Sequence, residues 1–96
     1  MTAEKMRVHF CRAHYVYWDA IERGDKRFFV DEADKDFRPG DVLMITRVKP
    51  LRSGAWAPVL NEDGTTVFLN ARIIYVECGT AGINDGCIIA AIEKMN

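Results

Sequence analysis

The sequence predicts one α+β domain over residues 1–96, a small, partly closed, mixed β-barrel of six or seven strands with one early helix. Its 96 residues are enough for one hydrophobic core and too few for two. Short apolar or alternating segments recur between Gly, Pro and Asp residues, which is typical of strands joined by turns. Closure into a barrel would protect the edges that an open sheet leaves exposed.

The first two elements are predicted to be a strand and a helix. Residues 7–12 alternate polar with apolar side chains, which is the period of a half-buried strand. Tyr17 and Ile21, four residues apart, give the segment 15–23 one apolar helical face. Gly24 follows directly and favours the left-handed conformation that ends a helix, so we expect the helix to stop there.

The middle of the chain contains its most apolar segment. Residues 27–30 are aromatic and β-branched, as in strands, and lead into an acidic turn at residues 31–36. A second turn follows at residues 37–41, which include a Pro-Gly pair. Residues 42–48 are almost continuously apolar, so we predict that they form the central strand.

The second half of the chain is predicted to be strands and turns. The Asp63-Gly64 pair predicts a hairpin between residues 56–60 and 65–69. Pro58 cannot donate a backbone hydrogen bond to a neighbouring strand, so the first of these strands should lie at an edge. The other predicted elements are a loop at 49–55, strands at 72–77 and 87–93, and a loop at 79–86.

Composition limits the classes of function. The chain has 13 Lys and Arg against 14 Asp and Glu, a net charge of −1. A protein that holds nucleic acid mainly through its phosphates usually has a basic excess, so any nucleic-acid site here must be a local patch. Cys11, Cys78 and Cys87 lack the spacing of a zinc site. We therefore expect three reduced structural thiols, no metal and no cofactor.

The sequence also bears on location. Its start lacks the long apolar stretch of a signal peptide. No apolar run approaches the about 20 residues that a membrane-spanning helix needs. We therefore expect a cytoplasmic protein without a membrane partner, while its oligomeric state stays open.

One pattern of residues is more specific than composition. It extends over most of residues 7–48, and residues 72–93 continue it with two strands that include 73–76 and 86–89. The positions that form the pattern in the first range are His9, Arg12, Tyr17, Trp18, Ala20, Ile21, Gly24, Lys26, Asp34, Phe37, Gly40, Asp41, Val42 and Leu43. With these residues in this order and spacing, the chain resembles the ASCH/PUA-like superfamily, in particular its branch of small uncharacterised domains common in bacteria and phages.

The resemblance implies a β-barrel whose cleft binds RNA or a nucleotide-like ligand beside the Gly-x-Lys turn. In one branch, which hydrolyses acylated cytidines, a lysine stands at Lys26 and a threonine nucleophile at Phe29. Binding branches carry an arginine at Asp31. Here Phe29 offers no nucleophilic atom, and Asp31 replaces a five-donor cation with an anion. We therefore expect a non-catalytic module with a degenerate cleft.

The residues expected in this cleft each have an alternative role. Lys26 could hold a phosphate or carboxylate, or it could be a solvated lysine after the helix. His9 and Arg12, three residues apart on a strand, point to opposite faces, and each could contact a ligand or serve the interior or surface. The aromatic residues could stack on bases or form the core. The expected cleft residues are His9, Arg12, Lys26, Phe29 and Asp31, and the aromatic residues are Tyr15, Tyr17, Trp18, Phe28 and Phe29.

Two features suggest contact with a protein instead. The acidic run could mimic nucleic-acid charge or meet a basic partner surface, or it could be a solvated turn. Trp56 follows Gly54 in a loop-like stretch and could anchor a partner or pack over the barrel end. The acidic candidates are Asp31, Glu32, Asp34 and Asp36.

The sequence leaves three functions open. The first is a non-catalytic module that binds RNA or a nucleotide-like ligand. The second is a protein-interaction module, such as a phage-encoded inhibitor of a host defence nuclease, acting through the acidic loop. The third is an amidohydrolase of acylated nucleosides, which is disfavoured because a residue such as Thr46, Thr65 or Thr66 would have to replace the missing nucleophile.

Overall fold

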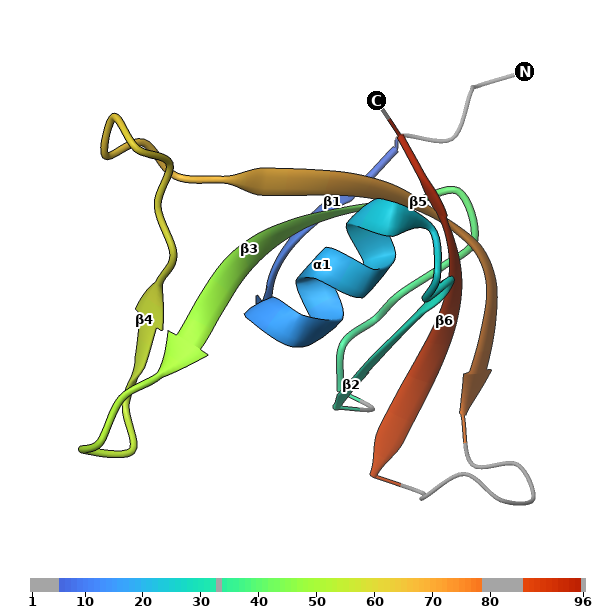
Figure 1. The fold of residues 1–96 in the computed structure, drawn as a ribbon. Helices are drawn as coiled ribbons and strands as arrows, with labels where there is room; N and C mark the ends of the chain where they lie inside the picture. The colour runs from blue at the N-terminus through green and yellow to red at the C-terminus, as the bar shows by residue number, and fades with distance from the viewer. Residues whose placement is uncertain (1–5, 33, 79–85, 96) are drawn as a thin grey trace.

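The computed structural model describes residues 6–32, 34–78 and 86–95. Within these ranges one helix lies on one face of a strongly curved sheet (Figure 1). The elements, in chain order, are β1 (Val8–His14), α1 (Tyr15–Arg23), β2 (Phe28–Glu32), β3 (Val42–Pro50), β4 (Trp56–Pro58), β5 (Phe68–Cys78) and β6 (Cys87–Lys94). In the described ranges no helix is long and apolar enough to cross a membrane.

The strands form one mixed sheet in the order β1-β3-β5-β6-β2, with β4 paired to the end of β3. The β1–β3 pair is parallel, and the other pairs are antiparallel. The apolar segment predicted to be central is β3, which lies between β1 and β5, so that prediction is confirmed. The predicted helix is also confirmed, with the same bounds.

The predicted closure into a barrel is not confirmed, because the end strands β1 and β2 do not pair and the sheet stays open between them. The physical reason is that α1 and the segment after it lie between these strands, where Tyr17 and Lys26 line the opening. His14 is both the last residue of β1 and the N-cap of α1, so the chain leaves the sheet at that residue. Trp18 and Ile21 of α1 are then buried against the concave face of the sheet.

Both ends of α1 are capped. At the first turn the Val16 N–H donates to Nδ1 of His14 over 3.1 Å, which satisfies one of the helix's free amide groups. At the last turn Gly24 has a φ of 85°, a left-handed conformation that costs other residues roughly 1–2 kcal/mol. The Gly24 N–H donates to the carbonyl of Ile21 over 3.0 Å. The chain then turns directly towards β2.

Polar contacts fix α1 on the sheet. The Trp18 indole Nε1–H donates to the carbonyl oxygen of Ile45 on β3 over 2.9 Å. Arg47, also on β3, forms a bidentate pair with Asp19 over 2.8 and 2.9 Å, the geometry that makes arginine–carboxylate pairs strong. Both contacts join the helix to the central strand.

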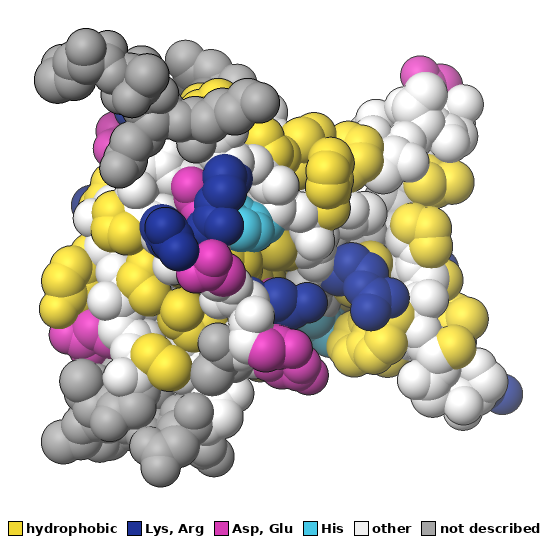
Figure 2. Space-filling view, turned by 180° about the vertical axis from the view of Figure 1, so that it is seen from behind, with side chains coloured by type: hydrophobic (Ala, Val, Ile, Leu, Met, Phe, Trp, Pro, Cys, Tyr) yellow, Lys and Arg dark blue, Asp and Glu magenta, His cyan; other side chains and the backbone are white. Residues whose placement is uncertain are grey.

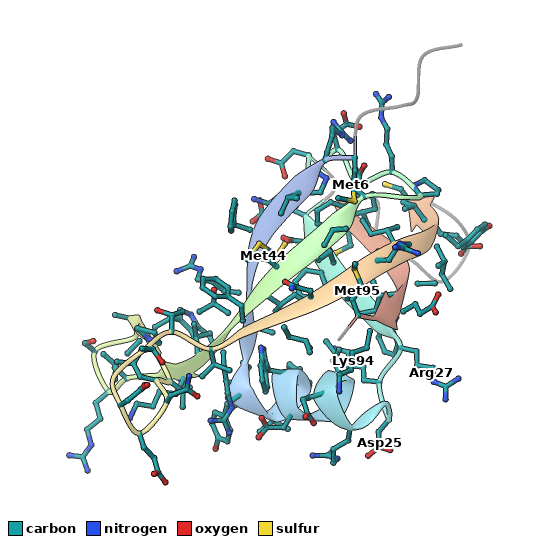
Figure 3. The ribbon with its side chains drawn as sticks, turned by 90° about the horizontal axis from the view of Figure 1, so that it is seen from above. Met6, Asp25, Arg27, Met44, Lys94 and Met95 are labelled. Atoms are coloured by element: carbon teal, nitrogen blue, oxygen red, sulfur yellow. The ribbon has the colours of Figure 1, made fainter. Side chains whose placement is uncertain are left out.

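A third contact joins α1 to β6. Lys94 Nζ donates to the backbone carbonyl of Glu22 over 3.0 Å. Figure 3 shows Lys94 close to the end of α1, where Asp25 and Arg27 begin the connection to β2. The helix is thus held from two different strands of the sheet.

The hydrophobic core lies between α1 and the concave face of the sheet. Its members come from every strand of the main sheet and from the helix. Leu43, Ile45 and Ala71 are completely buried. β3 and β5, two of the three interior strands of the sheet, therefore supply much of the centre of the core.

Several predicted boundaries were wrong. β2 continues through Asp31 and Glu32, so these two residues belong to a strand rather than to the acidic turn. The predicted strands at 65–69 and 72–77 are mostly one strand, β5, with an irregularity between Ile73 and Tyr75. Most of the predicted loop at 79–86 lies outside the described residues.

Residues 49–66, which we call the arm, extend away from the helix and β6 (Figure 1). The arm contains the predicted hairpin turn: Gly64 has a φ of 85°, and Leu60 and Thr66 form a β-bridge beside it. Among the described strands β4 pairs only with β3, so the edge position that Pro58 predicted is confirmed. Trp56 on β4 is 48% exposed.

Candidate ligand-binding cleft

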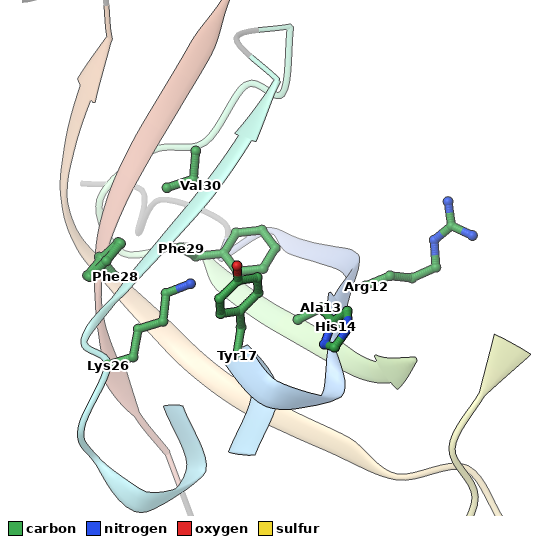
Figure 4. A pocket seen from close by; sticks show the side chains of 8 residues that line it. All are labelled: Arg12, Ala13, His14, Tyr17, Lys26, Phe28, Phe29 and Val30. Carbon is green, nitrogen blue, oxygen red and sulfur yellow. The ribbon is translucent and has the colours of Figure 1, made fainter. Parts of the chain in front are cut away.

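A cleft of about 560 Å³ lies at the opening between β1 and β2. This volume falls within the range of small-molecule sites in proteins. Its lining comes from the end of β1, the first turn of α1, the connection after α1 and the start of β2 (Figure 4). The lining residues are Arg12, Ala13, His14, Tyr17, Lys26, Phe28, Phe29 and Val30.

Lys26 is a partly buried cation of the cleft. Its Nζ lies 4.3 Å from the ring centroid of Tyr17 and 4.9 Å from that of Phe28, within range of cation–π attraction. Burial lowers the pKa of Lys26, since removing water disfavours the charged amine. In the ranges that the structure describes, no carboxylate pairs with this ammonium group.

His14 connects β1, α1 and the cleft. Its Nδ1 accepts the Val16 N–H, so the neutral ring carries its proton on Nε2, which is then a hydrogen-bond donor. The ring stacks on Tyr15 at a centroid distance of 4.7 Å and lies 5.8 Å from Tyr17. Helix capping therefore fixes both the position and the tautomer of this side chain.

Arg12 lies on the exposed face of β1, at the mouth of the cleft (Figure 4). No other side chain or backbone group among the described residues pairs with its guanidinium group. Arg12 and His14 also line a second hollow of about 180 Å³, together with Val48 and Trp56. The Trp56 ring meets the His14 ring nearly edge-on at 5.6 Å. The cleft therefore adjoins the arm through Arg12 and His14.

Phe29 forms an inner wall of the cleft and belongs to the core. Only 5% of its surface is exposed, and its ring lies 6.4 Å from that of Phe37. Of the two roles considered for the aromatic residues, the structure gives Phe29 and Trp18 the core role. Tyr15, Tyr17 and Phe28 are exposed, so they are available for ligand contact.

His9 lies outside this cleft. It faces the interior at the other end of β1, where its Nε2–H donates to Oδ2 of the buried Asp41 over 2.8 Å. Arg7 donates to the same oxygen over 3.0 Å and the Arg38 N–H over 3.2 Å. His9 also packs edge-on against Phe37 at 4.9 Å. The structure therefore gives His9 internal partners, and its predicted ligand contact has no support in the geometry.

The charge of Asp41 is stabilised by these donors. Burial by itself would raise the pKa of Asp41, but the hydrogen bonds from His9, Arg7 and Arg38 together hold it below the ordinary value. Close by, burial raises the pKa of the Cys11 thiol to about 11. Cys11 thus stays a neutral, buried thiol, as the sequence predicts, and all three cysteines are unbridged.

The acidic residues lie at the other end of the β1–β2 opening. Asp31 and Glu32 line a third hollow of about 320 Å³ together with Phe10, Cys11, Arg12 and Lys35, so Arg12 lines both this hollow and the cleft. Asp31 therefore borders the cleft without lining it. On the face seen in Figure 2, Lys, Arg and His side chains gather at a hollow between hydrophobic and acidic ones.

The other acidic candidates differ in their surroundings. Asp36 pairs with Arg7 over 3.1 Å and with Arg38 over 3.4 Å, and these hydrogen bonds lower its pKa. Asp34 is exposed. In the ranges with described placement, no group of three His, Cys, Asp or Glu side chains is arranged to hold a metal ion.

The resemblance predicted five cleft residues, and the structure places only some of them around this cleft. Of the five residues expected there, Arg12, Lys26 and Phe29 line it, whereas His9 and Asp31 do not. His14 was not expected to be a cleft residue. Its signal was the direct junction of a predicted strand with a predicted helix, which puts the capping side chain at the end of β1.

The chain belongs to a family of domains of unknown function, DUF3850, which matches residues 8–92. The match covers all of β1 to β5 and most of β6. No curated protein matches the sequence. Membership of this family assigns no ligand, so the choice of ligand depends on the geometry of the cleft.

Proposed function

We propose that this domain is a non-catalytic binding module whose cleft takes RNA or a nucleotide-like ligand. In this proposal Lys26 and Arg12 contact phosphate oxygens, and the exposed aromatic rings contact a base. The observation that carries it is the state of Lys26, which is partly buried beside two aromatic rings without a carboxylate partner among the described residues.

An unpaired, partly buried ammonium group costs free energy, and an anion in the cleft would reduce that cost. Lys26 and Arg12 are the cations of the cleft lining, and neither is neutralised by a described acidic side chain. His14 adds an Nε2–H donor, since its other nitrogen caps the helix. Lys26, Arg12 and His14 thus give one cleft two cations and a hydrogen-bond donor, groups that suit phosphate oxygens.

The walls of the cleft suit the flat part of a nucleotide. Tyr17 and Phe28 are exposed aromatic rings at its rim, and each base stacked on such a ring contributes about 1–3 kcal/mol. Phe29 and Val30 extend the apolar surface along β2. A phosphate joined to an aromatic base matches this lining better than an inorganic anion does.

Binding without catalysis is favoured by the identity of the lining residues. Phe29 stands where the resemblance to the hydrolytic branch places a threonine nucleophile, and it is buried in the core. A nucleophile needs a neighbouring base and an attacking atom, which Phe29 cannot supply. The resemblance to the ASCH/PUA-like superfamily, whose binding branches are implied to hold RNA or modified nucleosides, supports the same proposal.

Calorimetric titration with nucleoside 5′-monophosphates and a short single-stranded RNA tests it. We expect Lys26→Met to weaken binding by about 10-fold or more, because it removes a charge-assisted contact. Lys49→Met is the matched control for the monophosphates, since Lys49 is an exposed lysine on the arm outside the cleft, and it should leave their affinity unchanged. No binding by the wild-type protein, or equal losses in both variants, would overturn the proposal.

The pH dependence of binding provides a second measurement. A phosphate is held by the protonated form of Lys26, so affinity should fall as alkaline pH removes that proton. Because burial lowers the pKa of Lys26, the fall should be centred below 10.5, the ordinary lysine value. The Lys26→Met protein should lack this fall.

A second candidate function rests on a different observation. Phe10 is 74% exposed and lies beside Asp31 and Glu32 in the acidic hollow. An exposed aromatic ring next to carboxylates suits a basic protein surface, and a nuclease inhibitor would need such a surface. A pull-down from nuclease-treated lysate with the wild type and the D31K/E32K variant tests it: a partner lost only in the variant supports this function.

A further inference from the structure

The hollow beside Trp56 adds a feature that a single-nucleotide cleft does not require. It adjoins the cleft, and Arg12 and His14 line both. We propose that Trp56 and His14 form a second base-stacking subsite, so that the ligand is a single-stranded segment of two or more nucleotides. This inference rests on the proposed function, because the first nucleotide occupies the Lys26 cleft.

The aromatic rings form a continuous path from the cleft to the arm. Tyr17 lies 5.8 Å from His14, and His14 lies 5.6 Å from Trp56, measured between ring centroids. Both distances fall in the range of direct ring contact. Trp56 remains 48% exposed, so much of its surface is open to a base.

The position of Arg12 suits the phosphate between two stacked nucleotides. Arg12 lines both hollows, its side chain extends outward from β1 (Figure 4), and its guanidinium group lacks a partner among the described residues. A planar, always charged donor group binds a phosphodiester well. Lys26 at the inner end of the cleft would hold a terminal or preceding phosphate, which gives each nucleotide one cation.

The charged residues around the cleft also favour one direction in which a nucleic-acid ligand would extend out of it. The opening continues past Arg12 towards Asp31 and Glu32 on one side and towards Trp56 on the other. The hollow on that side is lined by two carboxylates as well as by Arg12 and Lys35, so the carboxylates offset the attraction of these cations for a second phosphate. The path over Trp56 has no acidic lining residue among those described, so the ligand should extend towards the arm.

The two tryptophans allow a direct measurement. Trp18 is buried and hydrogen-bonded to Ile45, whereas Trp56 is exposed, so quenching of fluorescence on binding should report on Trp56. Titrations compare a nucleoside monophosphate, a dinucleotide and a tetranucleotide of single-stranded RNA. We expect the dinucleotide to quench the fluorescence and to bind about 10-fold more tightly than the monophosphate, as one added stacking contact predicts.

Variants separate this inference from the proposed function. Trp56→Ala should weaken dinucleotide binding about 10-fold and leave monophosphate affinity unchanged. Leu51→Ala is the matched control, because Leu51 is another exposed apolar residue of the arm outside both hollows. Arg12→Met should reduce the dependence of dinucleotide affinity on salt, by about 0.7 in the log–log slope for one phosphate.

Each other outcome has a defined meaning. Equal affinities for monophosphate and dinucleotide, with no effect of Trp56→Ala, would overturn the second subsite and leave the single-nucleotide cleft standing. An equal loss for both ligands in Trp56→Ala would show that Trp56 only supports His14, which also overturns the inference. Absence of binding by every ligand would overturn the proposed function together with this inference.

Discussion

The two ends of β1 contain similar residue types in opposite states. At its start, Arg7 and His9 both donate to Asp41, which is only 8% exposed in its side chain. At its end, Arg12 and the nearby Lys26 have no carboxylate partner among the described residues, and Lys26 is partly buried all the same. One end satisfies its charges internally, and the other leaves cations available.

This difference assigns a role in folding stability to the first end and a role in ligand binding to the second. A buried carboxylate with three donors contributes to folding, because removing it leaves those donors unsatisfied. A partly buried cation without a counter-ion opposes folding and gains from a bound anion. A ligand that supplies the missing charge would account for such a cation. The contrast therefore leads to opposite predictions for the free energy of unfolding. Substitution of Asp41 should lower it, whereas substitution of Lys26 should leave it nearly unchanged or raise it.

The largest expected effect is at the satisfied end. Asp41→Ala should lower the free energy of unfolding by about 3 kcal/mol, because Arg7, His9 and the Arg38 N–H lose a buried charged acceptor. Urea denaturation measures this, and Asp34→Ala at an exposed position is the control. Ligand affinity of the folded Asp41→Ala protein should stay unchanged. A loss below about 1 kcal/mol would mean that this network behaves as a surface ion pair.

A smaller effect on stability is expected when the pH is lowered. The pKa of Asp41 in the folded protein is below its ordinary value, so its contribution to stability is complete above the unfolded value of about 3.9. That contribution is lost as pH falls through the lower, folded pKa. Asp41→Asn should therefore show a shallower decline of stability between neutral and strongly acidic pH. Asp19, Asp36 and Asp63 also have lowered pKa values, so part of the decline should remain.

The smallest effect is at the unsatisfied end. Lys26→Met should leave the free energy of unfolding within about 0.5 kcal/mol of the wild type, or raise it, because an apolar side chain replaces a partly desolvated charge. In the wild type this penalty is present at neutral pH and is relieved as pH rises towards 10.5. A clear loss of stability in the Lys26→Met protein, measured by urea denaturation, would place Lys26 with Asp41 as a structural residue.

Local patterns in the sequence determined much of this protein. The helix over residues 15–23, its end at Gly24, the central strand and the edge position of Pro58 follow from spacing, glycine conformation and the missing proline N–H. Lys26 and Arg12 were identified as cleft residues from a resemblance, and the structure brings both to one cleft. These features depend on residues that are near neighbours in the chain or on a pattern of fixed spacing.

Tertiary structure decided the rest. Whether β1 and β2 pair depends on the curvature of the whole sheet and on where α1 packs, which no local period encodes. The partner of His9 is 32 residues away at Asp41, and the Trp56 ring meets His14 across the arm. The same aromatic and charged residue types therefore became core, ion network or cleft according to contacts between distant segments, because burial and pairing are fixed only when the strands come together.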